Sequence, residues 1–282
     1  MKKISIATFT LALLLVSVSF NPSNAQEIGI QMGSMRHMYK EGIPAVLARI
    51  KELGVTELEG GSPRGMKREE FKKLLSEYGL KIVAVGGNFE RLQNKDSIQR
   101  IITNAKELGA QYVVCYWIPH DGDNFTYENM KKGVEVFNEA GKTLKENGLA
   151  LTYHPHGYEF RPYESGTMFD FLVKNTDPKY LNFEMDVFWV KHPGQDPVAL
   201  LKKYPQRFAL MHLKDRQPGT EGNQTGEADV ETNVVLGQGD VNIAAVMAEA
   251  KKIGIKHYFI EDESSRSVEQ IPLSLDYLHQ LK

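Results

Sequence analysis

One local pattern recurs along this 282-residue chain. An amphipathic, helix-like segment ends in a charged turn and a glycine, and an apolar run rich in β-branched residues follows at once. Glycine at a helix C-terminus accepts the left-handed conformation that closes the last turn, and short connections into a strand are usual in α/β units. The pattern therefore predicts alternating helices and strands. Its glycines are Gly54, Gly79, Gly109, Gly148 and Gly254.

The apolar runs define the predicted strands. They cover residues 28–32, 57–59, 82–85, 112–117, 149–153, 181–186, 208–212 and 258–261. Eight strands that alternate with helices favour a closed parallel barrel, the (β/α)8 or TIM barrel, over an open doubly wound sheet. Such barrels typically contain about 250 residues. We therefore predict an α/β fold with a single TIM-barrel domain over residues 26–282.

The N-terminal segment has the pattern of a secretory signal peptide. Two lysines are followed by an apolar stretch over residues 4–20 and by the small residues Ser23 and Ala25. A membrane anchor is the alternative, but the stretch is short for a span of about 20 residues and Ser and Thr interrupt it. We predict a signal peptide over residues 1–25, export to the periplasm, and no membrane span after cleavage.

Composition excludes several classes of function. The chain has 34 Lys and Arg against 36 Asp and Glu, with the signs mixed, so no basic stripe for nucleic acid is expected. Cys115 is the single cysteine and lies in an apolar run, which indicates a buried strand thiol and no intrachain disulfide. The glycines at 60–65 lack the spacing of a dinucleotide-binding turn.

Polar groups that can bind a metal follow four of the predicted strands. Because the carboxyl ends of parallel strands meet at one mouth of a barrel, we expect these groups to converge there. Carboxylates and imidazoles are ligands for Mn, Zn, Co or Mg. The groups are His154, His156 and Glu159 after the fifth strand, Glu184 and Asp186 in the sixth, His212 at the end of the seventh with Lys214 and Asp215 after it, and Glu261 at the end of the eighth with Glu263 after it.

Strand alternation suggests how these groups are directed. Glu184 and Asp186 share one side, with Glu184 one layer deeper. Glu261 and Glu263 point the same way, and Asp262 points the other way. We interpret Asp186 and His212 as metal ligands. The alternatives are a structural network of ion pairs for the acids and a satisfied core position for the histidine.

The spacing of the residues after the fifth strand does not decide which of them binds metal. His154 and His156 lie two residues apart and face one side if the strand continues, and Glu159 follows shortly after. One of the three would be a ligand and another a base or a substrate contact. Lys214 is a candidate cation that polarises a substrate oxygen and is oriented by Asp215, with a salt bridge at the rim as the alternative.

Aromatic and histidine side chains near the strand ends are candidate substrate contacts. Trp117, Phe188 and Trp189 could stack on a sugar ring, although core packing is the commoner role. His37 and His120 follow the first and fourth strands. The long irregular segment 216–240 follows the seventh strand, where a lid or substrate-contacting loop is favoured over a plain surface excursion.

At these residues the sequence resembles the sugar phosphate isomerase/epimerase family, the xylose-isomerase-like barrels. The resemblance runs over essentially the whole mature chain and is strongest at residues 153–160, 182–190, 207–215, 236–240 and 259–262. It implies one divalent metal at the barrel mouth, with Asp186, His212 and Glu261 at ligand positions. Many relatives have Glu at the end of strand five, where this chain has His154, so the fifth-strand ligand stays open. Similar proteins with a Tyr-His-x-His signature include secreted enzymes that act on unphosphorylated, oxidised sugars, among them keto-glycoside lyases.

These observations predict a metal-assisted enzyme that abstracts a proton next to the carbonyl of a sugar or keto-sugar, because that step needs a positioned base and a cation beside the oxygens. The outcome is isomerisation, epimerisation or 3-keto-glycoside elimination; the alternative is a non-catalytic, exported carbohydrate-binding barrel. We expect one divalent ion, a small carbohydrate substrate and no nucleic-acid partner. The oligomeric state is left open, with a homo-oligomer as one option. The predicted catalytic residues are His156, Glu159, Lys214 and Glu261; the metal ligands are His154, Asp186, His212 and Glu261; the substrate contacts are His37, His120, Trp189, Asp215 and Glu263.

Overall fold

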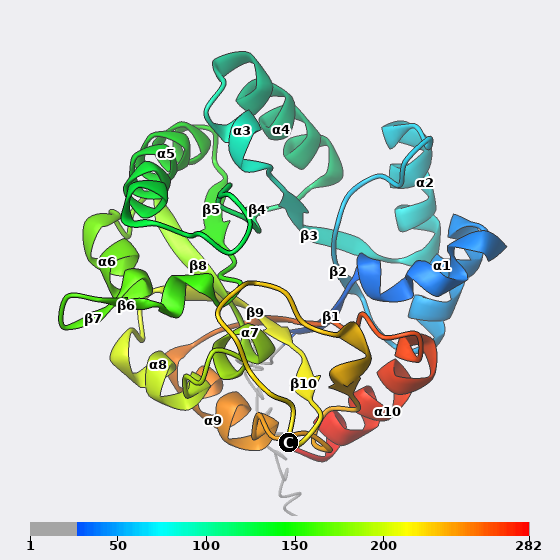
Figure 1. Ribbon diagram of the computed structural model, residues 1–282. Helices are drawn as coiled ribbons and strands as arrows, with labels where there is room; N and C mark the ends of the chain where they lie inside the picture. The colour runs from blue at the N-terminus through cyan, green and yellow to red at the C-terminus, as the bar shows by residue number, and fades with distance from the viewer. Residues whose placement is uncertain (1–26, 282) are drawn as a thin grey trace, which may run out of the picture.

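The computed structural model describes residues 27–281 as a closed parallel barrel surrounded by helices (Figure 1). Its strands pair in the order β1-β12-β9-β8-β5-β4-β3-β2. The predicted TIM barrel is confirmed, and each predicted strand is present with small differences at its ends. The barrel strands are β1 (Glu27–Gln31), β2 (Glu57–Glu59), β3 (Lys81–Gly86), β4 (Tyr112–Cys115), β5 (Ala150–Tyr153), β8 (Leu181–Asp186), β9 (Phe208–Leu213) and β12 (His257–Ile260).

Helices connect successive strands around the outside of the barrel. They are α1 (Ile43–Glu52), α2 (Arg68–Tyr78), α3 (Phe89–Leu92), α4 (Lys95–Leu108), α5 (Tyr127–Glu146), α6 (Met168–Asn175), α7 (Val187–Lys191), α8 (Pro197–Lys203), α9 (Ile243–Ile253) and α10 (Ser267–Gln280), with the 3₁₀ segments η1 (Met32–Glu41), η2 (Tyr158–Phe160) and η3 (Val230–Thr232). Two small hairpins pair β6 (Pro162–Tyr163) with β7 (Gly166–Thr167), and β10 (Asp215–Arg216) with β11 (Asn233–Val234).

The glycine stops act as the sequence predicts. Gly79, Gly109 and Gly254 close α2, α4 and α9 in the left-handed conformation, and each donates its backbone N–H to the last turn. Gly54 and Gly148 also have positive φ, of 74° and 78°. A side chain at such positions would be strained, so glycine fixes where each helix ends and where the next strand begins.

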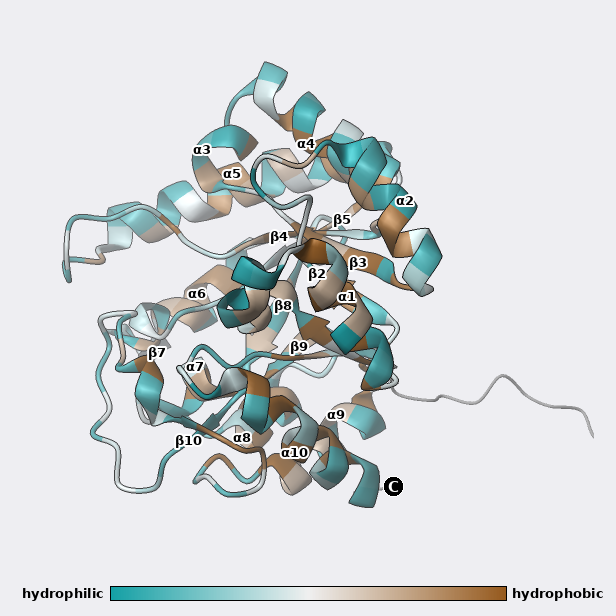
Figure 2. Ribbon diagram, turned by 90° about the vertical axis from the view of Figure 1, so that its right-hand side faces the viewer, coloured by the Kyte–Doolittle hydropathy of each residue, from teal (hydrophilic) through white to brown (hydrophobic). Residues whose placement is uncertain are grey.

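Strand alternation divides the side chains between two environments. Outward-facing residues such as Phe183 and Met211 pack in the main hydrophobic core. In Figure 2, β3 and β4 are mainly brown while the outer helices carry many teal residues. Inside the barrel, Val114, Leu210 and Phe259 form a separate apolar layer. Gly29 leaves room for it, because a Cβ there would lie 2.6 Å from the Phe259 ring.

The apolar layer separates two polar regions inside the barrel. At the N-terminal end of the strands, Glu57 pairs with His257 and Lys81. At the C-terminal mouth lie Glu184 and His212 among other ionisable groups. In the part of the chain that the structure describes, no helix combines the length and apolarity needed to cross a membrane. The predicted signal peptide, residues 1–25, lies outside the described residues.

Candidate metal centre

Four neighbouring strands carry acids and imidazoles into the mouth of the barrel. Asp186 ends β8, His212 lies near the end of β9, and Glu261 directly follows β12. One ligand atom from each of these three residues lies within 4.8 Å of the others. The strand ends therefore converge as the sequence analysis expects, because inward-facing positions of adjacent parallel strands are at similar heights.

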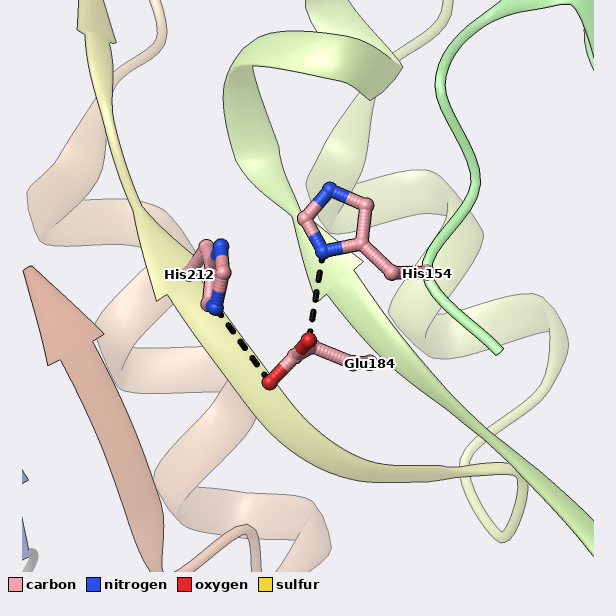
Figure 3. Close-up of side chains that lie close together, drawn as sticks. All are labelled: His154, Glu184 and His212. Atoms are coloured by element: carbon pink, nitrogen blue, oxygen red, sulfur yellow. Dashed lines mark hydrogen bonds and ion pairs between the residues drawn. The ribbon is translucent and has the colours of Figure 1, made fainter. Parts of the chain in front are cut away.

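A deeper layer lies beneath them, and Figure 3 shows its geometry. Glu184 Oε2 lies 3.2 Å from Nδ1 of His154, and Glu184 Oε1 lies 3.4 Å from Nε2 of His212. The three residues are at most 1% exposed. Glu184 is thus one layer below Asp186, as alternation predicts, and its carboxylate bridges the two imidazoles. The same three residues form a second group with metal-ligand spacing.

Glu59 also belongs to this deeper layer, although it was not among the site residues predicted from the sequence. Glu59 ends β2, and its Oε1 lies 2.9 Å from Nε2 of His212. The hydroxyl of Tyr116 donates a hydrogen bond of 2.9 Å to the same oxygen. The signal was present, because Glu59 ends a predicted strand in the way that Asp186 and Glu261 do.

Asp186 has two separate sets of contacts. Its Oδ1 accepts the backbone N–H groups of Phe188 and Trp189, at 2.8 and 3.1 Å, and so caps α7. Its Oδ2 lies 3.7 Å from Nε2 of His154 and 4.0 Å from Nδ1 of His212. Nδ1 of His212 also lies 3.2 Å from Oε2 of Glu261. The cap therefore directs Oδ2 toward the other ligand atoms.

Unpartnered polar atoms show that these residues suit a cation. Glu59 Oε2, His154 Nε2, Glu184 Oε1 and Asp186 Oδ2 are buried without a hydrogen-bond partner. Burying such atoms unpaired is costly. Imidazole nitrogen and carboxylate oxygen are the ligands that zinc and related divalent ions take. The donor set at the mouth therefore fits a divalent metal ion.

The pKa shifts of the buried groups at the mouth also indicate an excess of negative charge. Burial raises the pKa of Asp186 to about 7, against the charge of Lys214. Burial and the neighbouring Glu59 raise the pKa of Glu184 well above its usual value. Burial opposes a charge on His212, but the carboxylates around it outweigh burial and raise its pKa. The cluster would be relieved by protons or by a cation.

Lys214 is the buried cation of the mouth. Its Nζ lies 2.6 Å from Glu263 Oε2 and 3.2 Å from Glu261 Oε2, and the residue is 1% exposed. Burial alone would lower the pKa of Lys214, but the carboxylates led by Glu261 outweigh it and raise the pKa. Lys214 therefore stays protonated. Arg36 extends the chain of pairs outward by contacting Glu263 at 3.1 Å.

His156 lies between the two tryptophans. Its ring centroid is 5.6 Å from Trp117 and 5.4 Å from Trp189. Nδ1 lies 3.2 Å from the carbonyl oxygen of His154, and because a carbonyl can only accept, Nδ1 carries the proton. Burial lowers the pKa of His156 to about 4. The neutral ring thus keeps a lone pair on Nε2.

Glu159 has a different position from the one expected of a ligand. It lies in η2, fully buried, and its carboxylate accepts hydrogen bonds from the Tyr153 hydroxyl and from the backbone N–H of His156 at 3.1 Å. Burial raises the pKa of Glu159 to about 7. The chain leaves strand geometry after Tyr153, so alternation no longer directs this side chain. Among the described contacts, Glu159 fixes the turn that carries His156.

Asp215 does not orient Lys214, contrary to our expectation. It faces the opposite side of the chain, and its oxygens accept backbone N–H groups from Arg216, Gly237, Gly239 and Val241. Glu261 and Glu263 hold Lys214 instead. Asp215 therefore organises the segment that leads into α9.

The remaining predicted substrate contacts differ in position. Trp189 lies at the mouth, with Lys214 Nζ 5.7 Å from its ring centroid. His120 stacks on Trp117 at 4.7 Å, and its Nδ1 lies 2.7 Å from the carbonyl oxygen of Ile118. His37 is exposed on η1. His120 and Trp189 thus flank the aromatic part of the mouth, whereas no described contact joins His37 to it.

The long segment after β10 crosses the mouth. In Figure 1 it runs in yellow and orange in front of the barrel strands. The carbonyl oxygen of Gln224 accepts hydrogen bonds from Arg161, and Glu231 pairs with Arg266. A Cβ at Gly226, where φ is 83°, would lie 2.9 Å from the Trp117 ring. The segment therefore covers the aromatic side of the mouth, the position expected of a substrate-contacting loop.

Comparisons with known proteins agree with this architecture. The sequence model of the family described as "Xylose isomerase-like TIM barrel" matches residues 47–281. An inosose dehydratase from Geobacillus kaustophilus (strain HTA426) is 26% identical over 212 residues, which are 68% of this chain and 68% of the relative.

Solved structures give the same picture. A sugar phosphate isomerase/epimerase from Parabacteroides distasonis ATCC 8503 superposes with a TM-score of 0.73 at 26% identity, and the match covers 91% of this chain and 98% of that one. The IolI protein with a binding zinc atom superposes with a TM-score of 0.71 at 14% identity, covering 90% of this chain and 97% of that one. At that identity the second similarity shows the fold alone.

Proposed function

Because the chain belongs to the xylose isomerase-like TIM-barrel family, we propose that it is a divalent-metal-dependent enzyme that abstracts a proton next to the carbonyl of a sugar or keto-sugar. The observation that carries the proposal is the convergence of Asp186, His212 and Glu261, whose ligand atoms lie within 4.8 Å of one another, beside the buried, unpartnered atoms Asp186 Oδ2 and His154 Nε2. The similarity to an inosose dehydratase and to a sugar phosphate isomerase/epimerase supports a sugar-processing enzyme.

Four side chains would hold the ion. They are His154 through Nε2, Asp186 through Oδ2, His212 through Nδ1 and Glu261 through Oε2, since these atoms face one another across the mouth. A bound divalent ion would supply a Lewis acid beside the substrate oxygens. The fifth-strand ligand in this proposal is His154, because its Nε2 is buried without a hydrogen-bond partner and lies 3.7 Å from Oδ2 of Asp186.

His156 is the proposed base. Its Nε2 keeps a lone pair, and Glu159 holds its backbone through the turn. A neutral imidazole in this position can accept a proton from carbon and return it to carbon or to a departing group. Lys214, held protonated by Glu261 and Glu263, places a positive charge near the negative charge that develops on the substrate oxygen.

The substrate is proposed to be an uncharged sugar or keto-sugar. Trp117 is 37% exposed and offers aromatic surface beside His156, whereas Trp189, also beside that ring, is 6% exposed. The cations Lys214 and Arg36 are each paired with a carboxylate. A phosphate group would have to displace these pairs, so an unphosphorylated substrate is favoured.

Metal analysis of the purified protein tests the proposal first. We expect close to one divalent ion per chain. The metal-loaded protein should then exchange a carbon-bound proton of ketoses or 3-keto-glycosides for deuterium. Product analysis then separates isomerisation or epimerisation from elimination, which share the first step. Protein that binds sugar without metal and without exchange would support a carbohydrate-binding barrel and refute the enzyme.

Export to the periplasm is a separate proposal, based on the sequence of residues 1–25. The unphosphorylated sugar proposed as substrate suits that compartment. N-terminal sequencing of protein from a periplasmic extract should begin at Gln26. Protein that starts at Met1 and stays in the cytoplasmic fraction would contradict it.

A further inference from the structure

Glu59 and Glu184 lie beneath the candidate metal centre, out of reach of any substrate. Both are 0% exposed. We propose that they are positioning residues which set the direction of both imidazoles, so that His212 presents Nδ1 and His154 presents Nε2 to the ion. This inference rests on the metal centre of the proposed function.

The contacts of His212 fix its ring. Nε2 lies 2.9 Å from Glu59 Oε1 and 3.4 Å from Glu184 Oε1, on the lower side. Nδ1 lies 3.2 Å from Glu261 on the upper side. A metal-bound imidazole keeps its proton on the other nitrogen, where a carboxylate can accept it. The two lower carboxylates therefore select Nδ1 of His212 as the ligand atom.

His154 is directed by the opposite nitrogen. Its Nδ1 lies 3.2 Å from Glu184 Oε2, whereas Nε2 lies 3.7 Å from Asp186 and has no hydrogen-bond partner. Glu184 thus holds Nδ1 of His154 and lies beside Nε2 of His212, which Glu59 contacts more closely. The opposite nitrogens, Nε2 of His154 and Nδ1 of His212, lie 3.7 and 4.0 Å from Oδ2 of Asp186.

Tyr116, which directly follows β4, holds the carboxylate of Glu59 by a hydrogen bond. Its hydroxyl donates to Glu59 Oε1 at 2.9 Å, and its ring lies 5.6 Å from that of His154. A carboxylate that is itself held in place fixes the imidazole it contacts and increases the basicity of the ligand nitrogen. Loss of such a partner typically lowers metal affinity about 10–100-fold.

The chain provides a matched control in the same strand. Glu57 lies two residues before Glu59 in β2, also faces the barrel interior, and is 1% exposed. Its carboxylate pairs with His257 at 2.7 Å and with Lys81 at 2.9 Å, at the other end of the barrel. Substitution of Glu57 therefore perturbs a buried carboxylate of β2 without touching the metal centre.

The test measures zinc affinity of the full chain by chelator competition. Glu59→Gln and Glu184→Gln should each weaken zinc binding by about 10–100-fold, Tyr116→Phe should weaken it less, and Glu57→Gln should bind like the wild type. Binding by Glu59→Gln within twofold of the wild type, or an equal loss in Glu57→Gln, would overturn the proposal. A wild-type chain that binds no zinc would overturn the metal centre as well.

A second measurement needs no variant that must fold. In zinc-loaded wild-type protein labelled with ¹⁵N-histidine, NMR should identify Nδ1 of His212 and Nε2 of His154 as the metal-bound nitrogens. Coordination through Nε2 of His212 would refute the positioning role while leaving the metal centre intact.

Discussion

The two ends of the barrel interior hold carboxylates in opposite conditions. At the lower end, Glu57 has His257 and Lys81 as partners. Burial alone would raise the pKa of Glu57, but these two partners outweigh burial and lower the pKa. At the mouth, burial raises the pKa of Asp186 to about 7, and Glu184 also has a raised pKa. The lower end is balanced by its own side chains. The mouth has an excess of acid and unpartnered ligand atoms, as functional sites commonly have.

Removal of a proposed metal ligand should give the largest effect and so tests the contrast between the mouth and the lower end most directly. Asp186→Ala or His212→Ala should abolish metal retention and activity, with a loss of affinity beyond the ~100-fold typical of an outer partner. Metal content by elemental analysis and folding by circular dichroism measure the two effects. Unchanged metal content in both variants would remove the reason for treating the mouth as unbalanced.

Substitution of the proposed base separates chemistry from metal binding. His156→Ala should lower turnover by about 10²–10⁴-fold, the usual contribution of a general base, while the metal content stays near that of the wild type. Parallel losses of metal and turnover would make His156 a ligand. The measurement is kcat together with elemental analysis of the same sample.

Glu159 tests whether a raised pKa alone marks a functional acid. Its pKa is about 7 in the folded protein and 4.5 as a reference, because burial favours the protonated form. Between these values the native state binds more protons, so the stability of the wild type should fall as the pH rises from 4.5 past 7. The loss corresponds to roughly 3 kcal/mol at 1.36 kcal/mol per pH unit.

Glu159→Gln should lack this slope, since the side chain cannot titrate. Urea unfolding at pH 5 and pH 8 measures the difference between the two proteins. Turnover should also fall more than metal content, because Glu159 holds the turn that carries His156. Identical pH dependence in both proteins would show that burial does not control this carboxyl.

The smallest effect is expected at the lower end. Glu57→Gln should lower the free energy of unfolding by about 1–2 kcal/mol, because one buried partner of His257 loses its charge while the exposed Lys81 side of the pair is screened by solvent. Turnover should not change. A larger effect on turnover than on unfolding would mean that the two ends are not independent.

The sequence predicted the barrel and the convergence of Asp186, His212 and Glu261, because both follow from local periodicity. Glycine stops and apolar runs place the strands, and alternation decides which side chains face inward. Glu184 and Lys214 follow the same rule. The alternation of side chains along a strand thus carries most of the information about the candidate metal centre.

Other parts of the site depend on contacts that no local pattern contains. Glu59 and His212 are 153 positions apart and meet only when the barrel closes. Glu159 lies in a 3₁₀ turn, where alternation no longer holds, and Asp215 finds its partners in a loop more than twenty residues away. The preference for His154 over His156 likewise rests on a contact between two strands, that of His154 Nε2 with Asp186 Oδ2.

The double role of Asp186 has an optical consequence. One of its oxygens caps α7 through the backbone of Trp189, while the other faces the candidate ion. The chain has two tryptophans, and both flank His156. An ion bound to Asp186 would pull on a carboxylate that also contacts the backbone of Trp189, so we predict that the protein's own ultraviolet emission reports metal loading without an attached dye.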